Sequence, residues 1–381
     1  MKKILLLALI GATTSLMAMY AEHASLYKDP RIMGMGGANV AVGGYSTSVF
    51  SNPAGLAKIK KEHGIVVDLL GIGVSASGDS FLDFVDDFDA ADGDTVAMGE
   101  VLKKYAGTHF HIGVDDYTAI SKNSDAFAWS IGILAAADFN IMPHSDLSLS
   151  TSSRAYGGAV LGVAKPFSTE IGRLDVGMSV KYVQLESYED SLGVTDLIGE
   201  DDLQGYIEDK LASETGVGVD IGITYYPFED NFFNPAIGVS LLNIGSIDMN
   251  DAYGGQPMTL NVGASISPKV PYIDKLLFAV DYVDVLNANE LRLYNGDGTY
   301  NDYEEDDVVK RFRAGVSLGL FDTSVISLDL NGGLYQGAYT AGIDLEFLLF
   351  KLSAATYEEQ IGTGDVDISD RRYMAKIAIG W

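Results

Sequence analysis

The 381-residue sequence contains no cysteine, which excludes disulfide scaffolds, thiolate metal sites, cysteine nucleophiles and the lipid-modified cysteine of a bacterial lipoprotein. Basic residues are also scarce, because 25 lysines and arginines stand against 53 aspartates and glutamates and form no basic block. Affinity for nucleic acid depends on clustered basic side chains, so we predict no nucleic-acid partner. The chain is nevertheless 47% hydrophobic, which argues against disorder.

Long hydrophobic runs are absent too. After the first residues, no stretch approaches the ~18 apolar residues that a membrane-spanning helix needs. At the start, Lys2 and Lys3 precede a short apolar run, and small residues with candidate cleavage points at Ala18 and Ala21 follow. This layout predicts a secretory signal peptide over residues 1–21 and an exported protein, because the run is too short for an N-terminal membrane anchor.

Alternation of apolar with small or polar residues dominates the rest of the chain. Val217, Val219 and Ile221, for example, alternate with Gly218 and Asp220, as in a strand with one apolar face. We predict fourteen strands, over residues 64–76, 108–121, 125–139, 152–165, 172–188, 215–227, 235–245, 257–267, 274–286, 310–320, 324–333, 337–349, 351–357 and 371–381.

The lengths of the connections distinguish a membrane barrel from a soluble sandwich, which alternation alone does not. Long connections follow most odd strands, whereas turns of a few residues, such as 122–124 and 321–323, follow the even strands. An outer-membrane barrel with both termini in the periplasm has this pattern. We therefore predict an all-β fold, a transmembrane antiparallel β-barrel over residues 64–381 in the outer membrane of a Gram-negative bacterium, surrounded by outer-membrane lipid.

The long connections are acidic. More than half of the acidic residues lie in the four segments 77–107, 189–214, 287–309 and 358–370. We interpret these segments as solvated outer loops, with short amphipathic helices expected over 81–89 and 203–211.

The last strand has a second feature of an outer-membrane barrel. Its alternate apolar residues share one face, and the chain ends on an aromatic residue. This arrangement resembles the C-terminal signal of outer-membrane barrels, although the terminal residue there is usually phenylalanine. We predict that the barrel assembly machinery reads this face, which comprises Tyr373, Ile377, Ile379 and Trp381.

Residues 22–63, here called the hatch, precede the first strand and are rich in glycine. Asn52 can cap a helix that begins at Pro53, because proline at the first position loses no hydrogen bond. The segment GMGGA at 34–38 and the segment NPAGL at 52–56 resemble the FadL and TodX family of outer-membrane transporters for hydrophobic compounds. The stretch FLDFVDDFDAAD at 81–92 resembles the TraF-type branch of the same superfamily.

The resemblance implies that the hatch folds inside the barrel as a gate, and a barrel of this size needs a plug or water in its lumen. The implied gate residues are Gly34, Gly36, Gly37, Asn52, Pro53, Ala54, Gly55 and Leu56. The implied function is passive uptake of hydrophobic or amphipathic small molecules, such as long-chain fatty acids or hydrocarbons. The alternative is a barrel that does not transport but assists conjugative transfer, secretion or surface assembly.

Four basic residues on polar strand faces are candidates for binding a ligand carboxylate in the lumen. They are Lys181, Arg311, Arg313 and Lys376. The alternative is that they only pair with lumen acids such as Asp220, Asp329 and Asp344.

Residues suited to catalysis or metal binding are sparse. His109, His111 and Asp115 share one strand face and could hold a metal, but ordinary lumen polarity explains them as well. His144 beside Ser145 is weak support for a hydrolase, because adjacency in sequence is not the geometry that a nucleophile and base require. We predict no enzyme activity, no cofactor and no metal.

Overall fold

A computed structural model describes residues 22, 25–78, 80–91, 94–193, 210–228, 231–247, 254–294, 300–304, 306–323, 325–362 and 368–380. The predicted signal peptide, the terminal Trp381 and nearly all of the expected helix over 203–211 lie outside these residues. No helix in the described part of the chain is long and apolar enough to cross a membrane.

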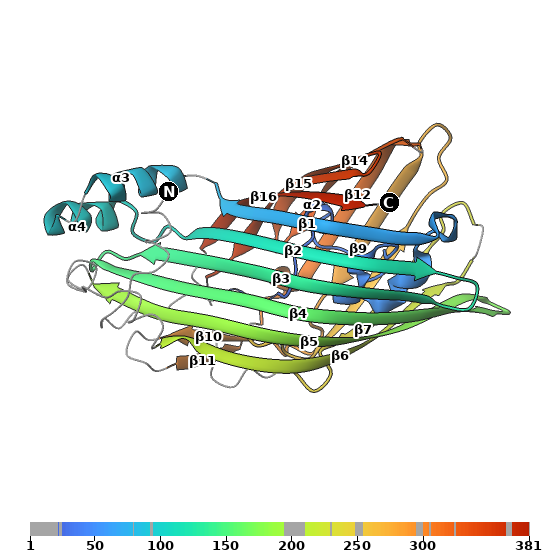
Figure 1. Ribbon diagram of the computed structural model, residues 1–381, viewed down its shortest axis with the longest axis horizontal. Helices are drawn as coiled ribbons and strands as arrows, with labels where there is room; N and C mark the ends of the chain where they lie inside the picture. The colour runs from blue at the N-terminus through green and yellow to red at the C-terminus, as the bar shows by residue number, and fades with distance from the viewer. Residues whose placement is uncertain are drawn as a thin grey trace.

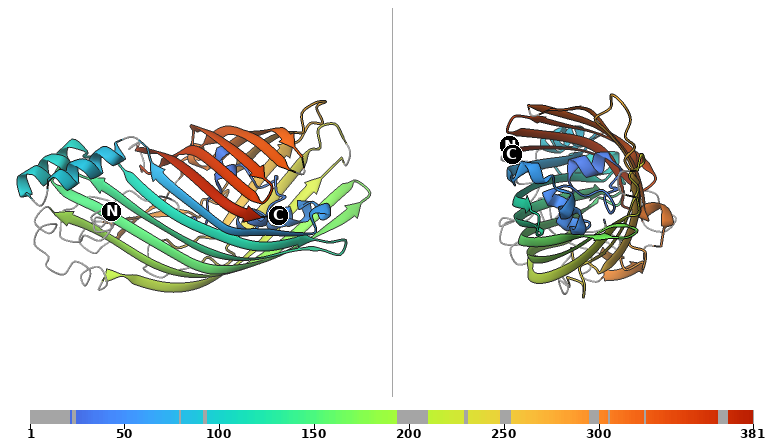
Figure 2. Two further views of the ribbon diagram at one scale, coloured as in Figure 1. Left: turned by 45° about the horizontal axis from the view of Figure 1, so that its top comes forward. Right: turned by 90° about the vertical axis from the view of Figure 1, so that its right-hand side faces the viewer.

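Fourteen antiparallel strands form a closed barrel, as predicted (Figures 1 and 2). The barrel strands are β1 (Ile65–Ser77), β2 (Phe110–Asn123), β3 (Ala128–Pro143), β4 (Ser148–Thr169), β5 (Gly172–Gly193), β6 (Ala212–Tyr226), β7 (Ala236–Leu242), β8 (Thr259–Ile266), β9 (Lys275–Tyr282), β12 (Phe312–Asp322), β13 (Ile326–Tyr335), β14 (Ala338–Phe347), β15 (Phe350–Gln360) and β16 (Ser369–Gly380). Each strand pairs with its neighbours in order, and β1 pairs with β16 to close the sheet. Because the sheet is closed, no barrel strand has an unpaired edge, and a barrel in lipid requires this.

Apolar side chains point outward and polar ones inward. In β3, Ile131 and Ile133 are 53% and 64% exposed, whereas Ser130, the residue before Ile131, is buried. In β16, Tyr373 and Ile377 face outward and Arg372 is fully buried inside. An apolar outer surface around a polar lumen is the signature of a transmembrane barrel, so the predicted strand faces are confirmed.

The wall is much taller on one side. β4 and β5 have 22 residues each, whereas β7 has 7 and β8 and β9 have 8. At ~3.3 Å per residue, the longest strands extend roughly 70 Å, far more than the ~25 Å apolar band of such barrels. The wall therefore extends further on the side of β4 and β5 than on the side of β7, β8 and β9 (Figure 1).

The outer segments hold more regular structure than expected. The predicted helix over 81–89 is present as α3 (Phe81–Ala90), and α4 (Thr95–Lys104) follows it, capped by Asp94. Phe84 of α3 stacks on Phe110 at 4.7 Å and anchors this helix pair to the rim.

The segment 287–309, expected as a loop, contains regular structure. A hairpin of β10 (Glu290–Tyr294) and β11 (Tyr300–Glu304) and the short helix α7 (Val308–Arg311) lie there. The many charges in this segment concealed the alternation that a two-stranded ribbon needs.

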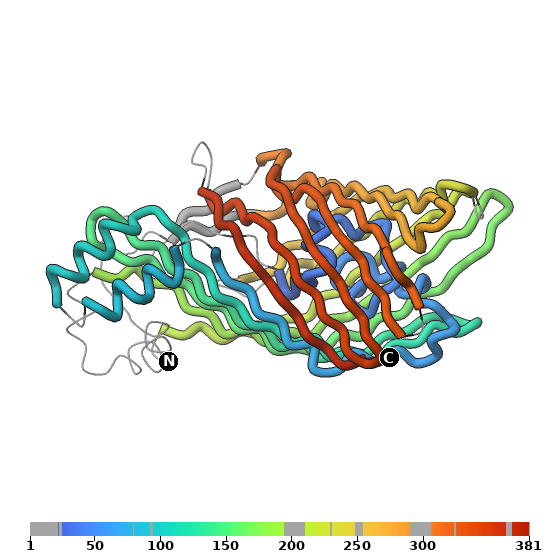
Figure 3. The backbone as a smooth tube through the Cα atoms, turned by 90° about the horizontal axis from the view of Figure 1, so that it is seen from above, coloured from blue at the N-terminus to red at the C-terminus, as the bar shows by residue number. Residues whose placement is uncertain are grey.

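The hatch lies inside the barrel (Figures 2 and 3). Its helical turns are α2 (Pro30–Gly34), η1 (Ser46–Phe50), η2 (Pro53–Lys58) and η3 (Lys61–His63). The helix predicted after Asn52 is therefore a short 3₁₀ turn that ends at Lys58, and a separate turn follows it.

Candidate functional site

Glycines of the wall let the hatch come into direct contact with the strands. A β-carbon on Gly177 of β5 would lie 2.3 Å from the backbone nitrogen of Ala54, and one on Gly315 of β12 would lie 2.1 Å from the carbonyl oxygen of Met35. Such distances exclude any side chain unless the hatch moves. These wall glycines were visible in the sequence only as members of the small-residue face, and their pairing with the hatch was not predictable.

Glycines of the hatch make the same kind of contact from the other side. Gly34 packs on Gly342 of β14, where an added β-carbon would lie 2.9 Å from the α-carbon of Gly342. Gly36 has a φ of 68° and lies against the carbonyl oxygen of Ala314. Gly37 also has a positive φ, and Gly55 packs against Gly43 within the hatch.

Asn52 connects the hatch to itself and to the wall. Its Oδ1 accepts a hydrogen bond from the backbone nitrogen of Ala54 at 3.1 Å, which caps η2. Its Nδ2 donates to the carbonyl of Val40 at 2.7 Å and to the carbonyl of Ile223 in β6 at 3.2 Å. Pro53, Ala54 and Leu56 follow and are buried. The structure thus places these predicted gate residues at the contact between hatch and strands.

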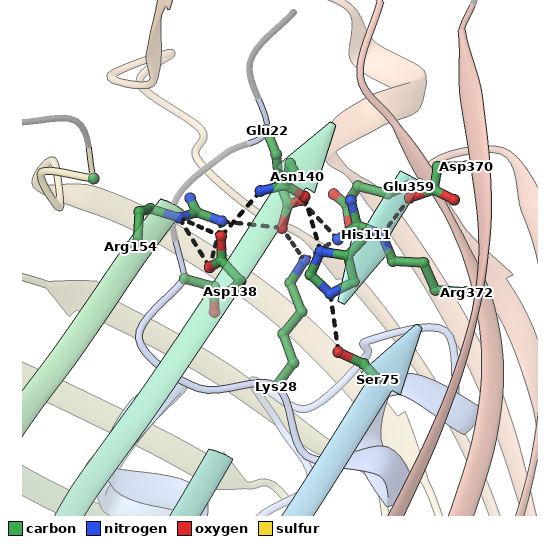
Figure 4. Close-up of polar contacts among 12 residues, drawn as sticks. Glu22, Lys28, Ser75, His111, Asp138, Asn140, Arg154, Glu359, Asp370 and Arg372 are labelled. Carbon is green, nitrogen blue, oxygen red and sulfur yellow. Dashed lines mark hydrogen bonds and ion pairs between the residues drawn. The ribbon is translucent and has the colours of Figure 1, made fainter. Parts of the chain in front are cut away.

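A buried network of charges holds the start of the hatch (Figure 4). The carboxylate of Glu22 lies 2.7 Å from Arg372 of β16 and 2.7 Å from Lys28. Lys28 also lies 2.7 Å from Glu359 of β15, and Arg154 of β4 contacts Glu22 at 3.8 Å. Sequence reasoning missed this network because its members are separated by up to 350 positions and carry no local pattern.

Burial raises the pKa of Glu22, but the positive charges of Arg372, Lys28 and Arg154 outweigh it and hold the pKa well below its ordinary value. Glu22 is therefore ionised at neutral pH and ties the hatch to the barrel through charge-assisted bonds.

The four predicted carboxylate-binding residues do not converge on one site. Lys181 lies 2.9 Å from Asp220, so this lysine pairs with a lumen acid. Lys376 donates to the hydroxyl of Tyr27 in the hatch, and Arg313 stacks on the ring of Tyr335 at 3.9 Å.

Arg311 departs furthest from expectation. It ends α7 instead of lying in a strand, and its guanidinium donates to backbone carbonyls, among them that of Asp306 at 2.6 Å. The other acids have partners of their own, because Asp329 contacts Lys275 at 2.5 Å and Asp344 accepts from Asn331 at 2.5 Å. Of the four basic residues, Lys181 is the one that pairs with a lumen acid, and the four do not form a common carboxylate site.

His109 and His111 take part in hydrogen bonds inside the barrel. His111 bridges Ser75 at 2.9 Å and Asn140 at 2.8 Å, and His109 contacts Asp370 at 3.0 Å. In the described part of the chain, no group of three or more histidine, aspartate or glutamate residues is placed to hold a metal ion.

A cavity of about 260 Å³ lies between the hatch and the wall. The hatch contributes apolar side chains to it, including Leu26, Ile32 and Phe50, and the wall side contributes Leu242 and Val283. Polar groups on the lining include Asn39, Lys181, Asn243, Asn261, Asp281 and Asp284. The cavity therefore offers both apolar surface and polar groups to an amphipathic small molecule.

A second hollow, of about 500 Å³, lies at the end of the hatch next to the short turns. Lys58 and Lys61 of the hatch and Arg173 of β5 line it, together with Asn123, which donates to the carbonyl of Ala57 at 2.9 Å. Hatch residues therefore line both hollows, and the hatch lies between a ligand-sized cavity and the end of the barrel with short turns.

Comparison with known proteins agrees with this architecture. The profile of the family described as "F plasmid transfer operon, TraF, protein" matches residues 49–253. The toluene transporter TbuX of Ralstonia pickettii has the same fold, with a TM-score of 0.53, 13% identity, and coverage of 93% of this chain and 97% of its own. The toluene transporter TodX of Pseudomonas putida has a TM-score of 0.54 and 11% identity, and the match covers 95% of this chain and 99% of TodX. No curated protein sequence matches the chain. The predicted resemblance is confirmed.

Proposed function

We propose that this chain, which belongs to the family described as "F plasmid transfer operon, TraF, protein", is a passive outer-membrane channel for hydrophobic or amphipathic small molecules. The observation that carries the proposal is the hatch, which lies inside the barrel and shares with its wall a cavity of about 260 Å³ that is lined by both apolar and polar side chains. In this proposal the hatch is the gate.

The shared fold with two toluene transporters supports the proposal, although identities of 13% and 11% establish similarity of fold alone. The contacts around the hatch support it further. The hatch meets the wall through glycines, a shared apolar cluster, many hydrogen bonds and an ionic network, but none of these contacts belongs to the strand ladders, so the hatch can shift without breaking them. Passage then needs only a shift of the hatch and no covalent chemistry.

We infer from the apolar outer surface and the fold that the chain resides in the outer membrane, in contact with lipid. Tyr373, Ile377 and Ile379 lie on the outward or partly exposed face of β16, where the barrel assembly machinery could read them. Their role as an assembly signal remains a prediction.

The family description favours a second candidate, a barrel that assists conjugative transfer, secretion or surface assembly. The tall wall and the α3–α4 pair give such a role a large surface beyond the membrane. Neighbouring genes separate the two candidates, because degradation genes for hydrocarbons or fatty acids favour transport and transfer or secretion genes favour assembly.

The direct test is deletion of residues 22–57, followed by single-channel conductance in planar bilayers. If the hatch plugs the lumen, the deletion variant should show large, steady openings that the intact protein lacks. Uptake of toluene by cells should change as well. A deletion variant that conducts as little as the intact protein would remove the main support for the gate.

A further inference from the structure

We propose that the second hollow, next to the short turns, is a site for the anionic group of a small molecule, a carboxylate or a phosphate, and that Lys58 and Lys61 of the hatch bind it. This inference goes beyond the proposed channel, because it assigns a site that shares no lining residue with the cavity between hatch and wall.

The lining of the second hollow is positively charged. Lys58, Lys61 and Arg173 lie on it, and no aspartate or glutamate of the described chain does. The whole sequence, in contrast, carries a formal charge of -28. Cations that share a concave surface without acids create a local positive potential, which attracts anions.

Lys58 differs from the other lysines of the hatch, because it has no carboxylate partner among the residues that the structure describes. Lys28 lies 2.7 Å from a carboxylate oxygen, and Lys60 and Lys61 each lie 3.1 Å from one. Lys58 instead donates to the backbone carbonyl of Val42 at 2.7 Å. An ammonium group has three N–H donors, so Lys58 keeps two for a ligand.

A ligand can reach both lysines. Lys58 is exposed, and the side chain of Lys61 is 50% exposed. The partner of Lys61 is Asp125, which is fully exposed, and an ion pair between exposed side chains contributes little to stability. Lys61 can therefore turn from Asp125 to an anion in the hollow at little cost.

Arg173 has a different role, because its guanidinium is already engaged. Its Nε donates to one carboxylate oxygen of Asp175 at 2.7 Å, and its Nη2 donates to the other at 2.8 Å. Nη2 also donates to the carbonyl of Ala57 in the hatch at 3.1 Å. Arg173 thus fixes the wall of the hollow next to the hatch, and contact with the anion falls to the two lysines.

The position and size of the hollow suit a small molecule with a charged end. Asn123 ends β2, and Ser168 and Arg173 flank the short turn between β4 and β5, so the hollow lies at the short-turn end of the lumen. Its volume of about 500 Å³ falls within the usual range for small-molecule sites of roughly 300–1,000 Å³. Carboxylate and phosphate oxygens both accept charge-assisted hydrogen bonds from ammonium groups.

The test is calorimetric titration of the full-length protein in phosphatidylcholine nanodiscs at pH 7.5 and low ionic strength, where exposed charges are weakly screened. Empty nanodiscs are the blank for partitioning into lipid. Octanoate should occupy a site that octan-1-ol, which has an equally long chain but no charge, does not occupy. If octanoate binds no better to the protein than to the blank, the inference is wrong.

Inorganic phosphate as a competitor distinguishes two sources of the anion. Displacement of octanoate by phosphate supports a site for free anions, whereas binding of octanoate without displacement supports a site for the charged end of an amphipathic molecule. In both cases the binding should depend on Lys58.

A matched pair of variants locates the site. Lys58→Met removes the ammonium and keeps an unbranched side chain, and its affinity for octanoate should fall about tenfold, as expected for the loss of a charge-assisted contact. Lys60→Met removes the same charge two positions away, from a side chain that does not line the hollow, and should bind octanoate as the unmodified protein does. Lys58→Arg keeps the charge and should retain most of the binding, which separates loss of charge from disturbance of the hatch.

Two outcomes with these variants would overturn the inference. Lys58→Met could bind octanoate as tightly as the unmodified protein, or Lys60→Met could lose as much affinity as Lys58→Met, which would indicate a general effect of charge. Neither outcome bears on the channel, because the deletion of residues 22–57 tests the gate by conductance. Conversely, a deletion variant that stays closed would contradict the channel and leave the anion site, which is measured in the intact protein, unaffected.

Discussion

The carboxylate of Glu22 lies 2.7 Å from the guanidinium of Arg372, so the start of the hatch is bonded to the last strand of the barrel. Arg372 is fully buried and also contacts Asp370 at 2.7 Å. β16 is also the strand that closes the barrel by pairing with β1. The hatch is therefore held to the strand at which the wall closes, and we expect the ion pairs at this point to govern how firmly it is held.

Acid should release the hatch, but only well below neutral pH. The pKa of Glu22 is lower in the folded protein than in the unfolded chain, so its stabilising contribution is complete above the unfolded value of about 4.3 and is lost as pH falls through the folded value. Conductance in planar bilayers should be constant from about pH 8 to pH 5 and rise only in stronger acid. A rise centred near pH 6 or 7 would contradict this assignment.

The variant Glu22→Gln should mimic the acid state at neutral pH. It removes the charge while keeping the size of the side chain, and it leaves Arg372 and Lys28 with one partner fewer. Docking of the hatch should weaken by roughly 1–3 kcal/mol, as for other buried charged groups that lose a partner. Frequent openings at pH 7.5 in bilayer recordings would show this, and a variant as quiet as the unmodified protein would refute it.

Replacement of Asn52 should separate its two roles. Asn52→Ala loses both the cap of η2 and the bonds to the wall, and loss of the cap alone destabilises a helix end by about 1 kcal/mol. Asn52→Asp keeps an oxygen for the cap but loses the Nδ2 donor.

Both Asn52 variants should assemble, because strand pairing does not involve this residue, and heat-modifiable migration in gels checks that. If the bonds to the wall hold the gate, both variants should open more often than the unmodified protein. Openings in Asn52→Ala alone would mean that the cap matters and the wall bonds do not.

A single methyl group should displace the hatch where the wall is glycine. In Gly177→Ala, the new β-carbon would meet the backbone of Pro53 and Ala54 at 2.3 Å, so η2 must move away from β5. Gly157→Ala in β4 is the matched control, because a β-carbon there meets nothing within 4 Å. Limited proteolysis of the hatch should be faster in Gly177→Ala and unchanged in Gly157→Ala. Equal proteolysis of the two variants would show that the close contact does not position the hatch.

The barrel was predictable because its signal is local and repeated. In β12, for example, Phe312 is exposed on the outside and Arg313 is buried inside. The sequence predicts this because successive side chains of a strand point to opposite faces. The prediction failed just before this strand, where Asp307 accepts from the backbone nitrogen of Val309 and begins the helical turn that contains Arg311. The cap formed by Asp307 therefore places Arg311 in a helical turn, although the alternation predicted a strand there.

The candidate site was harder to predict, because it forms between segments that are distant in sequence. Asn52 and Pro53 were recognised from their local capping pattern, but Gly177 and Gly222 face them from strands more than 120 residues away. The ion pair of Lys181 and the contact of Lys376 with Tyr27 depend on which neighbours satisfy each side chain. Those neighbours follow from the closed barrel and not from any motif.

The most direct test of the account locks the hatch to the wall. A β-carbon on Gly162 of β4 would lie 2.7 Å from Cγ1 of Val49 in η1, which places cysteines at these two positions within reach of a disulfide. The chain has no cysteine of its own, so Val49→Cys with Gly162→Cys gives a single defined pair. The single variant Gly162→Cys is the control for the displacement that a side chain at this position causes, and Val49→Cys is the second control.

The decisive measurement is uptake of toluene by cells whose outer membrane carries the double variant, before and after reduction with dithiothreitol. If passage requires movement of the hatch, the oxidised protein should give only background uptake, and reduction should restore the rate of the single variants. Uptake by the oxidised double variant at the rate of the reduced protein would contradict the account.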